Sequence, residues 1–330
     1  MSLEELSGKS DRSLLLVHGR DFKPAEEAYM DLSMAALRSG IERDCPDLLD
    51  AFDAVQKSVA WYGDLNADVL HACGKKYDES LDIGDRRNAL AALREITVRK
   101  RFGIRQYDCL PGKSALPEAI VDVLAPVLGA VGLCLPLIRT VSRDFARYFD
   151  QKSDYAMQVR ERLRTRLCEL IDRGDKIVLI SHGTGSVVAY EVLWQLSHDP
   201  DLKEQYADKK IELWMTLGSP LGDSNIRKRL LGAKEKPMTK FPVNVISWHN
   251  VAAEDDYTCH DNTLADDFKL MMQQRVVSAV HDYRIFNLAV RYGRSNPHSS
   301  IGYLIHPRVS KILADWLKQR DPQSTPKYTF

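Results

Sequence analysis

The sequence carries no excess of charge of either sign and no closely spaced pair of cysteines. Lysine plus arginine number 46, aspartate plus glutamate also number 46, and the formal net charge at pH 7 is zero. A neutral chain has no long-range field to attract nucleic acid or an anionic membrane, and we expect no nucleic-acid partner. The absence of any CxxC pair argues against a zinc ribbon and a disulfide scaffold. The scattered cysteines are Cys45, Cys73, Cys109, Cys134, Cys168 and Cys259.

The first residues, MSLEELSGKSDR, lack the apolar core of a secretion signal, so we expect a cytoplasmic protein with reduced thiols. Residues 123–138 (VLAPVLGAVGLCLPLI) form an uncharged stretch that is short for a membrane span. Pro126 and Pro136 would interrupt a straight helix there. We expect a buried or lid-forming helix pair, and weak contact with a membrane or lipid is the alternative interpretation.

Short apolar runs alternate with segments of helical periodicity along the chain. The predicted strands are residues 13–17, 58–62, 176–181, 211–217 and 243–248. The predicted helices are residues 24–37, 155–173, 186–196 and 306–318. This alternation predicts an α/β fold with a mainly parallel central sheet and helices on both faces. Ligands of such sheets bind at the carboxyl ends of the strands.

Residues 64–150 contain charged helical segments and no evident strand. We therefore predict a helical insertion, of the lid or cap type, inside a single domain that spans residues 1–330. Residues 321–330 are rich in proline, serine and lysine and are predicted to be a loose tail. The sequence does not indicate an oligomeric state.

The clearest predicted strand runs into the turn Ser181-His182-Gly183-Thr184-Gly185, and a helix follows. A strand, tight turn and helix with G-x-S-x-G at the turn form a nucleophile elbow, which exposes the central serine above the sheet. Gly183 occupies that central position and has no side chain to acylate. A dinucleotide fingerprint would need a third small residue, where this chain has Val188, so no cofactor is predicted.

The segment VLISHGTGSVVAYEVLW resembles the elbow of bacterial α/β-hydrolases of the lipase and esterase type. Three further segments resemble the same family in the same order. They are LLLVHG at 14–19, WMTLGSPLG at 214–222 and NPHSSIGYL at 296–304. The resemblance implies an α/β-hydrolase fold with a helical lid, and it implies activity on an ester or another acyl substrate.

The resemblance also implies roles for particular residues. The backbone N–H groups of Arg20 and Thr184 would form the oxyanion hole, and His298 would be the general base. The acid that orients the base would be Asp256, with its neighbour Asp255 as the second choice. The implied chain order of nucleophile site, acid and histidine is that of the α/β-hydrolases.

Two other side-chain groups were weighed as sites. Cys259, His260 and Asp261 could suggest a metal, but adjacent residues rarely bind one ion together, and we predict no metal site. His182 stands where the family often has a histidine packed under the turn, so no chemical role is assigned to it.

Gly183 has three explanations. In the first, a serine was replaced to give an inactive protein. In the second, the glycine is natural and the protein binds a ligand without turnover. In the third, the glycine is natural and a water molecule attacks the substrate, with His298 as general base. The leading prediction is a hydrolase of an ester or acyl substrate, with low or no activity in this chain. The apolar insertion points toward a lipophilic substrate. The alternative is a non-catalytic pseudoenzyme that binds an acyl or carboxylate ligand or a protein partner.

Overall fold

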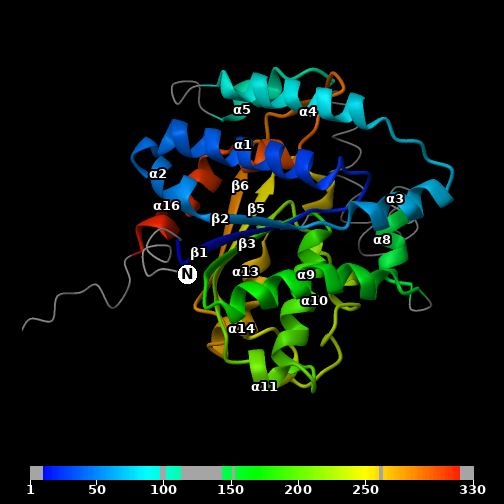
Figure 1. The fold of residues 1–330 in the computed structure, drawn as a ribbon, viewed down its shortest axis with the longest axis vertical. Coiled ribbons are helices and arrows are strands. Elements are labelled where there is room, and N and C mark those ends of the chain that lie inside the picture. Colours follow the sequence, from blue (N-terminus) through cyan, green and yellow to red (C-terminus); the bar gives the residue numbers. More distant parts are fainter. Residues whose placement is uncertain (1–9, 97–101, 113–142, 151–152, 260–262, 320–330) are drawn as a thin grey trace, which may run out of the picture.

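A six-stranded, entirely parallel sheet forms the centre of the computed structural model, which describes residues 10–96, 102–112, 143–150, 153–259 and 263–319 (Figure 1). The strands lie in the order β2-β1-β3-β4-β5-β6. Their bounds are β1 Arg12–Val17, β2 Gln56–Ala60, β3 Lys176–His182, β4 Ile211–Leu217, β5 Val245–Ala253 and β6 Ala279–Ile285. The predicted α/β fold with a mainly parallel sheet is confirmed.

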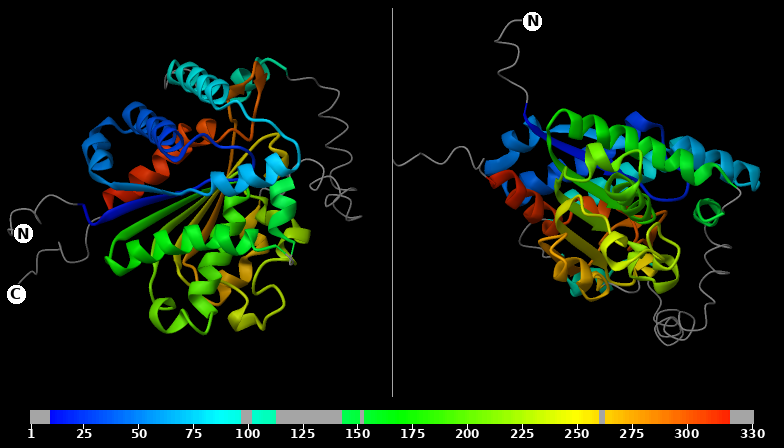
Figure 2. Two further views of the ribbon diagram at one scale, coloured as in Figure 1. Left: turned by 45° about the vertical axis from the view of Figure 1, so that its right-hand side comes forward. Right: turned by 90° about the horizontal axis from the view of Figure 1, so that it is seen from below.

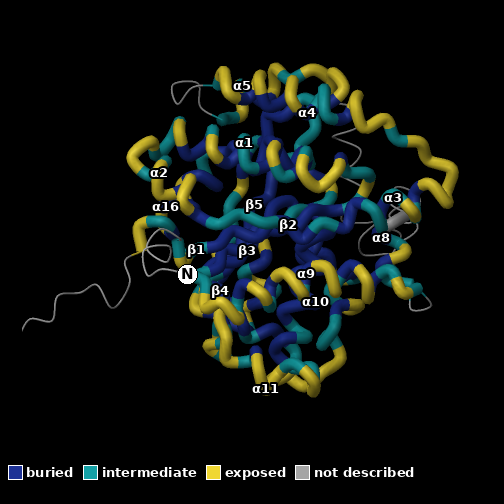
Figure 3. Tube along the Cα trace, in the orientation of Figure 1, coloured by how far each residue is buried: buried dark blue, intermediate teal, exposed yellow. Residues whose placement is uncertain are grey.

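Helices cover both faces of the sheet (Figure 2). One face carries α1 (Glu26–Asp44), α15 (Ser300–Leu304) and α16 (Pro307–Lys318), and the other carries α9 (Tyr155–Asp172) and α10 (Gly185–His198). Alternate residues of a strand point to opposite faces. Leu14 and Leu16 of β1 accordingly belong to the core under α1, whereas Leu15 and Val17 belong to the core under α9 and α10. Strands β1, β3 and β4 are therefore buried on both sides, and Figure 3 shows the centre of the molecule mostly in dark blue, the colour of buried residues.

The remaining elements are short or lie outside these layers. They are α2 Leu49–Ala54, α3 Gly63–Ala72, α4 Glu79–Arg94, α5 Ile104–Asp108, α8 Arg143–Tyr148, α11 Lys203–Tyr206, α12 Ser224–Arg227, α13 Leu264–Asp267, α14 Lys269–Gln273, and the antiparallel pair β7 Val290–Arg291 and β8 Arg294–Ser295. Figure 1 shows α4 and α5 stacked outside α1, away from the sheet.

The insertion and the two apolar or loose segments can be followed only in part. The described parts of residues 64–150 are the helices α3, α4, α5 and α8 with their connections, and none of them forms a strand. Residues 123–138 and 321–330 lie outside the described residues. In the part of the chain that the structure describes, no helix is long and apolar enough to cross a membrane.

The sheet differs from the sequence prediction at its β5–β6 edge. Strand β6 was not predicted, because it is an edge strand whose charged and polar residues (AVHDYRI) interrupt any apolar run. Strand β5 continues to Ala253 instead of ending at Trp248, because the polar side chain of Asn250 is satisfied inside the sheet. The amide oxygen of Asn250 accepts a hydrogen bond from the Thr216 hydroxyl at 2.9 Å, and its amide nitrogen donates one to the Asp282 carboxylate at 2.9 Å.

The strand order reverses its direction at β1. The chain passes from β1 to its neighbour β2, and then returns to place β3 on the other side of β1. In open parallel sheets, ligands bind in the crevice outside the carboxyl ends of the strands at such a reversal. Gly19 follows β1 and Gly183 follows β3, so both predicted turns lie at this crevice.

Candidate active site

The turn between β3 and α10 has the backbone geometry of an elbow. Gly183 has φ +55°, in the left-handed region that glycine adopts without the steric cost borne by other residues. Its N–H donates a 2.8 Å hydrogen bond to the carbonyl of Leu217, at the end of the neighbouring strand β4. Helix α10 begins two residues later, at Gly185. The turn therefore holds residue 183 at the carboxyl edge of the sheet.

Two further glycines allow the turns after β1 and β3 to touch. A Cβ atom at Gly185 would lie 2.3 Å from the carbonyl oxygen of His18. A Cβ atom at Gly19 would lie 2.9 Å from the carbonyl oxygen of His182 and 3.4 Å from the amide nitrogen of Thr184. Any side chain at either position would push the two turns apart.

Asp256, which is buried, and His298 form a hydrogen-bonded pair. The Nδ1 atom of His298 lies 2.9 Å from Oδ2 of Asp256, and the Asp256 carboxylate also accepts from the Tyr303 hydroxyl (2.7 Å) and the Thr258 N–H (3.0 Å). Burial alone would raise the pKa of Asp256. The charge and hydrogen bond of His298, with the bonds from Tyr303 and Thr258, outweigh burial and hold that pKa at about 2. The carboxylate is therefore ionised at neutral pH and orients the imidazole.

Asp255, the second choice for the acid, lies elsewhere. Its carboxylate accepts a 2.7 Å hydrogen bond from the hydroxyl of Tyr107, which belongs to α5. Asp255 also has φ +59°, so the backbone turns sharply between the two aspartates and separates their side chains. The structure thus brings Asp256, and not Asp255, to His298.

The free edge of the His298 ring faces the nucleophile position. A Cβ atom at Gly183 would lie 2.9 Å from Nε2 of His298 and 3.1 Å from Cε1. The His298 side chain is 24 % exposed, whereas that of Asp256 is fully buried. The imidazole therefore lies directly over the space of the missing side chain. A serine side chain at 183 would require the ring to shift.

Gly218 and Tyr303 belong to this site, although the sequence analysis gave neither a role. Gly218 directly follows β4 and has φ +57°, and a Cβ atom there would lie 2.6 Å from Oδ2 of Asp256 and 3.2 Å from Nδ1 of His298. The glycine thus leaves the space in which the acid and base meet. Both residues fall in segments that carry the family resemblance, but their contacts arise only in the folded chain.

The backbone N–H groups of Arg20 and Thr184 lie at the crevice between β1 and β3. Neither N–H donates a hydrogen bond to any of the described residues. Both residues line a cavity of about 10 Å³, with Tyr62, Tyr148 and Val188 among its walls. This volume is close to the minimum that one water molecule needs. The two residues that the resemblance assigns to the oxyanion hole therefore line the same cavity, and each has an unused backbone donor.

Two neighbouring histidines are structural in this arrangement. The ring of His182 packs on that of His298, with the ring centroids 4.5 Å apart, and its Nε2 donates to the carbonyl of His298 at 3.0 Å. Burial, followed by the electrostatic effect of His298, holds the pKa of His182 well below its usual range. Burial likewise lowers the pKa of His18 to about 3, and its Nε2 accepts from the N–H of Tyr62. Both rings are therefore neutral near pH 7.

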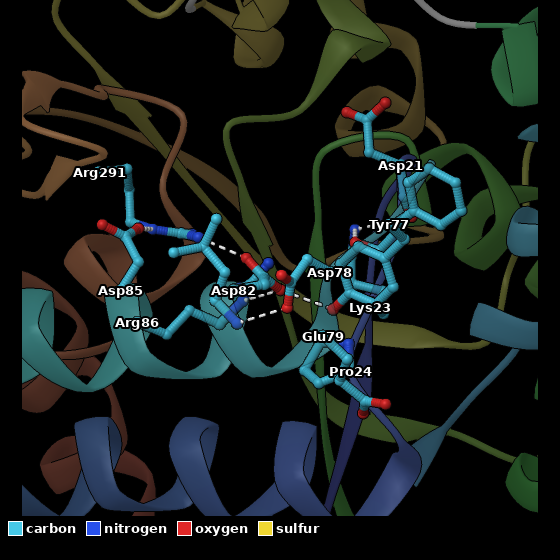
Figure 4. A network of polar contacts seen from close by, with 12 residues as sticks. Asp21, Lys23, Pro24, Tyr77, Asp78, Glu79, Asp82, Asp85, Arg86 and Arg291 are labelled. Atoms are coloured by element: carbon cyan, nitrogen blue, oxygen red, sulfur yellow. Dashed lines mark hydrogen bonds and ion pairs between the residues drawn. The ribbon is translucent and has the colours of Figure 1, made fainter. Parts of the chain in front are cut away.

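Helix α4 is joined to the segment that precedes His298 by a network of buried charges (Figure 4). Arg291, at the β7–β8 hairpin, forms ion pairs with Asp82 and Asp85 of α4. Asp82 also pairs with Arg86 at 2.8 Å and accepts from the hydroxyl of Tyr77. Burial opposes the charge of Asp82, but these partners hold its pKa at about 2. Helix α4 and the hairpin are thus held together by charges that stay ionised at neutral pH.

Neither a metal site nor a match to known proteins adds to this picture. Within the described residues, no group of three or more His, Cys, Asp or Glu side chains could hold a metal ion. His260 and Asp261, which were weighed as ligands, lie outside those residues. Comparisons of the chain with protein-family models, curated proteins and solved structures found no match.

Proposed function

We propose that this chain is an α/β-hydrolase-fold protein that hydrolyses an ester or another acyl substrate without an acyl-enzyme intermediate. The observation that carries the proposal is the position of His298. Its Nδ1 is bonded to the buried carboxylate of Asp256, and its Nε2 lies 2.9 Å from the Cβ position of a residue that has no side chain. An oriented imidazole over an empty nucleophile position favours water as the nucleophile.

In this mechanism a water molecule bound to Nε2 of His298 attacks the acyl carbon. Its proton passes to Nε2, and Asp256 stabilises the imidazolium that forms. The negative charge on the acyl oxygen is held by the N–H groups of Arg20 and Thr184, the second of which lies at the amino end of α10. When the bond to the leaving oxygen breaks, Nε2 returns the proton to that oxygen. The products are a carboxylic acid and an alcohol.

The expected rate is modest. Triad enzymes that lack a member retain about 10³- to 10⁴-fold acceleration over water, through the oxyanion hole and binding. General-base assistance by His298 adds to that basis, since such assistance contributes about 10²- to 10⁴-fold in enzymes generally. Turnover slower than that of serine esterases is therefore consistent with the proposal.

The cavity walls support an acyl substrate. Phe145, Tyr148 and Val188 contribute apolar surface to the cavity, which Arg20 and Asn66 also line. Its volume of about 10 Å³ is far below the roughly 300 Å³ of a small-ligand pocket. Binding therefore requires the walls contributed by α8 and α9 to move. A lipophilic acyl group is the substrate that such walls would accept.

The decisive experiment assays the unaltered chain on p-nitrophenyl esters of short and long acids. We expect slow hydrolysis that His298→Ala reduces to background. Asp256→Asn should reduce it about as much, because the imidazole loses its orienting anion. Asp255→Asn is the matched control from the same loop, and it should retain the rate because the carboxylate of Asp255 is bonded to Tyr107.

A serine at position 183 tests the class of protein separately. Gly183→Ser should react covalently with a fluorophosphonate probe, and Gly183→Ala should not. If only Gly183→Ser turns over, the water mechanism is wrong, although the site is that of a hydrolase. If neither the unaltered chain nor Gly183→Ser hydrolyses or labels, the hydrolase proposal is wrong. Non-catalytic binding of an acyl or carboxylate ligand, or of a protein partner, would then be the remaining function.

A further inference from the structure

The loop that carries His298 is held by hydrogen bonds to its backbone carbonyls. Asn287 donates one side-chain N–H to the carbonyl of Pro297 (2.8 Å) and the other to that of Ser299 (2.9 Å). The carbonyl between them, that of His298 itself, accepts from Nε2 of His182 (3.0 Å). Three successive carbonyls are therefore fixed by side chains from two other segments, one after β6 and one at the end of β3.

The Asn287 side chain has only one orientation available. Both of its N–H groups are used, and its Oδ1 accepts from the N–H of Ala289 at 3.1 Å. Gly302 of α15 packs so closely that a Cβ atom there would lie 1.8 Å from this oxygen. Asn287 is fully buried. The amide therefore links the segment after β6 rigidly to the loop that carries His298.

The oxyanion turn is held in the same way from the insertion. Asn66 of α3 donates from Nδ2 to the carbonyls of Gly19 and Asp21, each at 3.2 Å. These two carbonyls flank Arg20, whose N–H is one of the two unused donors. The Oδ1 atom of Asn66 accepts from the hydroxyl of Tyr155, and Asn66 is fully buried.

We propose that Asn287 and Asn66 are positioning residues for the two halves of the site, a proposal that rests on the proposed hydrolase function. Each uses both amide hydrogens to fix the backbone on either side of one working residue. Asn287 sets the distance between the His298 ring and residue 183, and Asn66 sets the direction of the Arg20 N–H. Misplacing a reacting group by about 1 Å can cost 10²-fold in rate.

The chain contains a matched control for a purely structural role. Asn244 precedes β5, at the edge of the sheet opposite the site. It donates from Nδ2 to the carbonyls of Tyr206 (2.7 Å) and Lys209 (2.9 Å), and its Oδ1 accepts from Ser197. Asn244 is also fully buried. It therefore makes the same set of hydrogen bonds without touching the site.

The test replaces each asparagine with leucine, which has a similar shape and no polar atom. All three variants should lose thermal stability to a similar extent, because each removes two hydrogen bonds from a fully buried amide to backbone carbonyls. On p-nitrophenyl acetate, only Asn287→Leu and Asn66→Leu should lower kcat, by about 10- to 100-fold, with KM nearly unchanged. Asn244→Leu should retain kcat.

A second readout does not depend on turnover. In ¹H–¹³C NMR spectra of the histidine rings, Asn287→Leu should move the His298 cross-peak clearly, and Asn244→Leu should not. If the unaltered chain hydrolyses nothing, the proposed function fails, and the NMR comparison still tests Asn287. If Asn287→Leu does not fold, Asn287→Asp keeps the shape and at most one donor, and should move kcat and the cross-peak in the same direction. Equal behaviour of the Asn287 and Asn244 variants in both readouts would overturn the proposal.

Discussion

Gly218→Ala adds only one methyl group, but it should lower the stability of the protein strongly, because that methyl group points at Asp256 and His298. Two costs are separable. The left-handed backbone (φ +57°) costs about 1–2 kcal/mol for a residue with a Cβ atom. The Cβ atom would also lie 2.6 Å from Oδ2 of Asp256 and 3.0 Å from the Tyr303 hydroxyl. Forcing a methyl group into a packed interior costs about 1–3 kcal/mol more.

Gly174→Ala isolates the backbone cost. Gly174 has φ +76°, and a Cβ atom there would have no other atom within 4 Å. We therefore expect a loss of about 1–2 kcal/mol in Gly174→Ala and about 2–5 kcal/mol in Gly218→Ala. At about 2 °C per kcal/mol for a chain of this size, the two variants should unfold about 2–4 °C and 4–10 °C below the unaltered chain.

The assay is thermal unfolding of the two variants, followed by ester hydrolysis at a temperature where both are folded. Gly218→Ala should lose the ester hydrolysis that we propose, because Asp256 must move away from His298 to admit the methyl group. Gly174→Ala should retain it. If Gly218→Ala unfolds at the same temperature as Gly174→Ala and keeps its activity, the predicted crowding between residue 218 and Asp256 is refuted.

Three further predictions concern stability. Asp256 has a folded-state pKa of about 2 against 3.8 when unperturbed, so it contributes about 2 kcal/mol above roughly pH 4 that disappears as the pH falls through 2. The difference in unfolding free energy between the unaltered chain and Asp256→Asn should therefore shrink over that interval, and a constant difference would contradict the low pKa. Arg291→Met removes the partner of two carboxylates and should cost about 3 kcal/mol or more in urea unfolding; a cost below about 1 kcal/mol would show that the network is unimportant. Gly185→Ala should also destabilise strongly in urea, because its Cβ atom meets the carbonyl of His18 at 2.3 Å. Gly84→Ala, in a helix with open space around it, should instead stabilise by about 0.5–1 kcal/mol, and the same sign in both variants would contradict the packing argument.

The interior strands could be predicted from sequence because burial on both faces requires uninterrupted apolar runs. The runs at 13–17, 176–181 and 211–217 coincide with β1, β3 and β4 to within a residue. Strand β6 could not be found in this way, because it is half-exposed at the sheet edge and tolerates His281 and Asp282. The end of β5 was misplaced because the polar Asn250 reads as a loop residue until its partners are known.

From the sequence, only the positions of the candidate site residues could be predicted, and not their arrangement in space. The resemblance named Asp256 and Asp255 together, since one loop register cannot be distinguished from the next without the backbone. The positive φ of Asp255 decides between them, because it turns one carboxylate toward Tyr107 and leaves the other beside His298. The role that we propose for Asn287 could not be predicted from its neighbours in the sequence, because the carbonyls to which it donates lie ten or more residues further along the chain.

The sequence by itself determined the α/β class and the sharp turn at residue 183, because strand periodicity, apolar runs and glycines are local properties of the chain. It also determined that position 183 carries no nucleophilic side chain. Only the tertiary structure decided what surrounds that position. It placed the imidazole of His298 over Gly183, placed Gly218 beside the Asp256–His298 hydrogen bond, and joined α3 to the turn after β1 through Asn66. These contacts join residues far apart in the chain, so they exist only after the strands have assembled into the sheet.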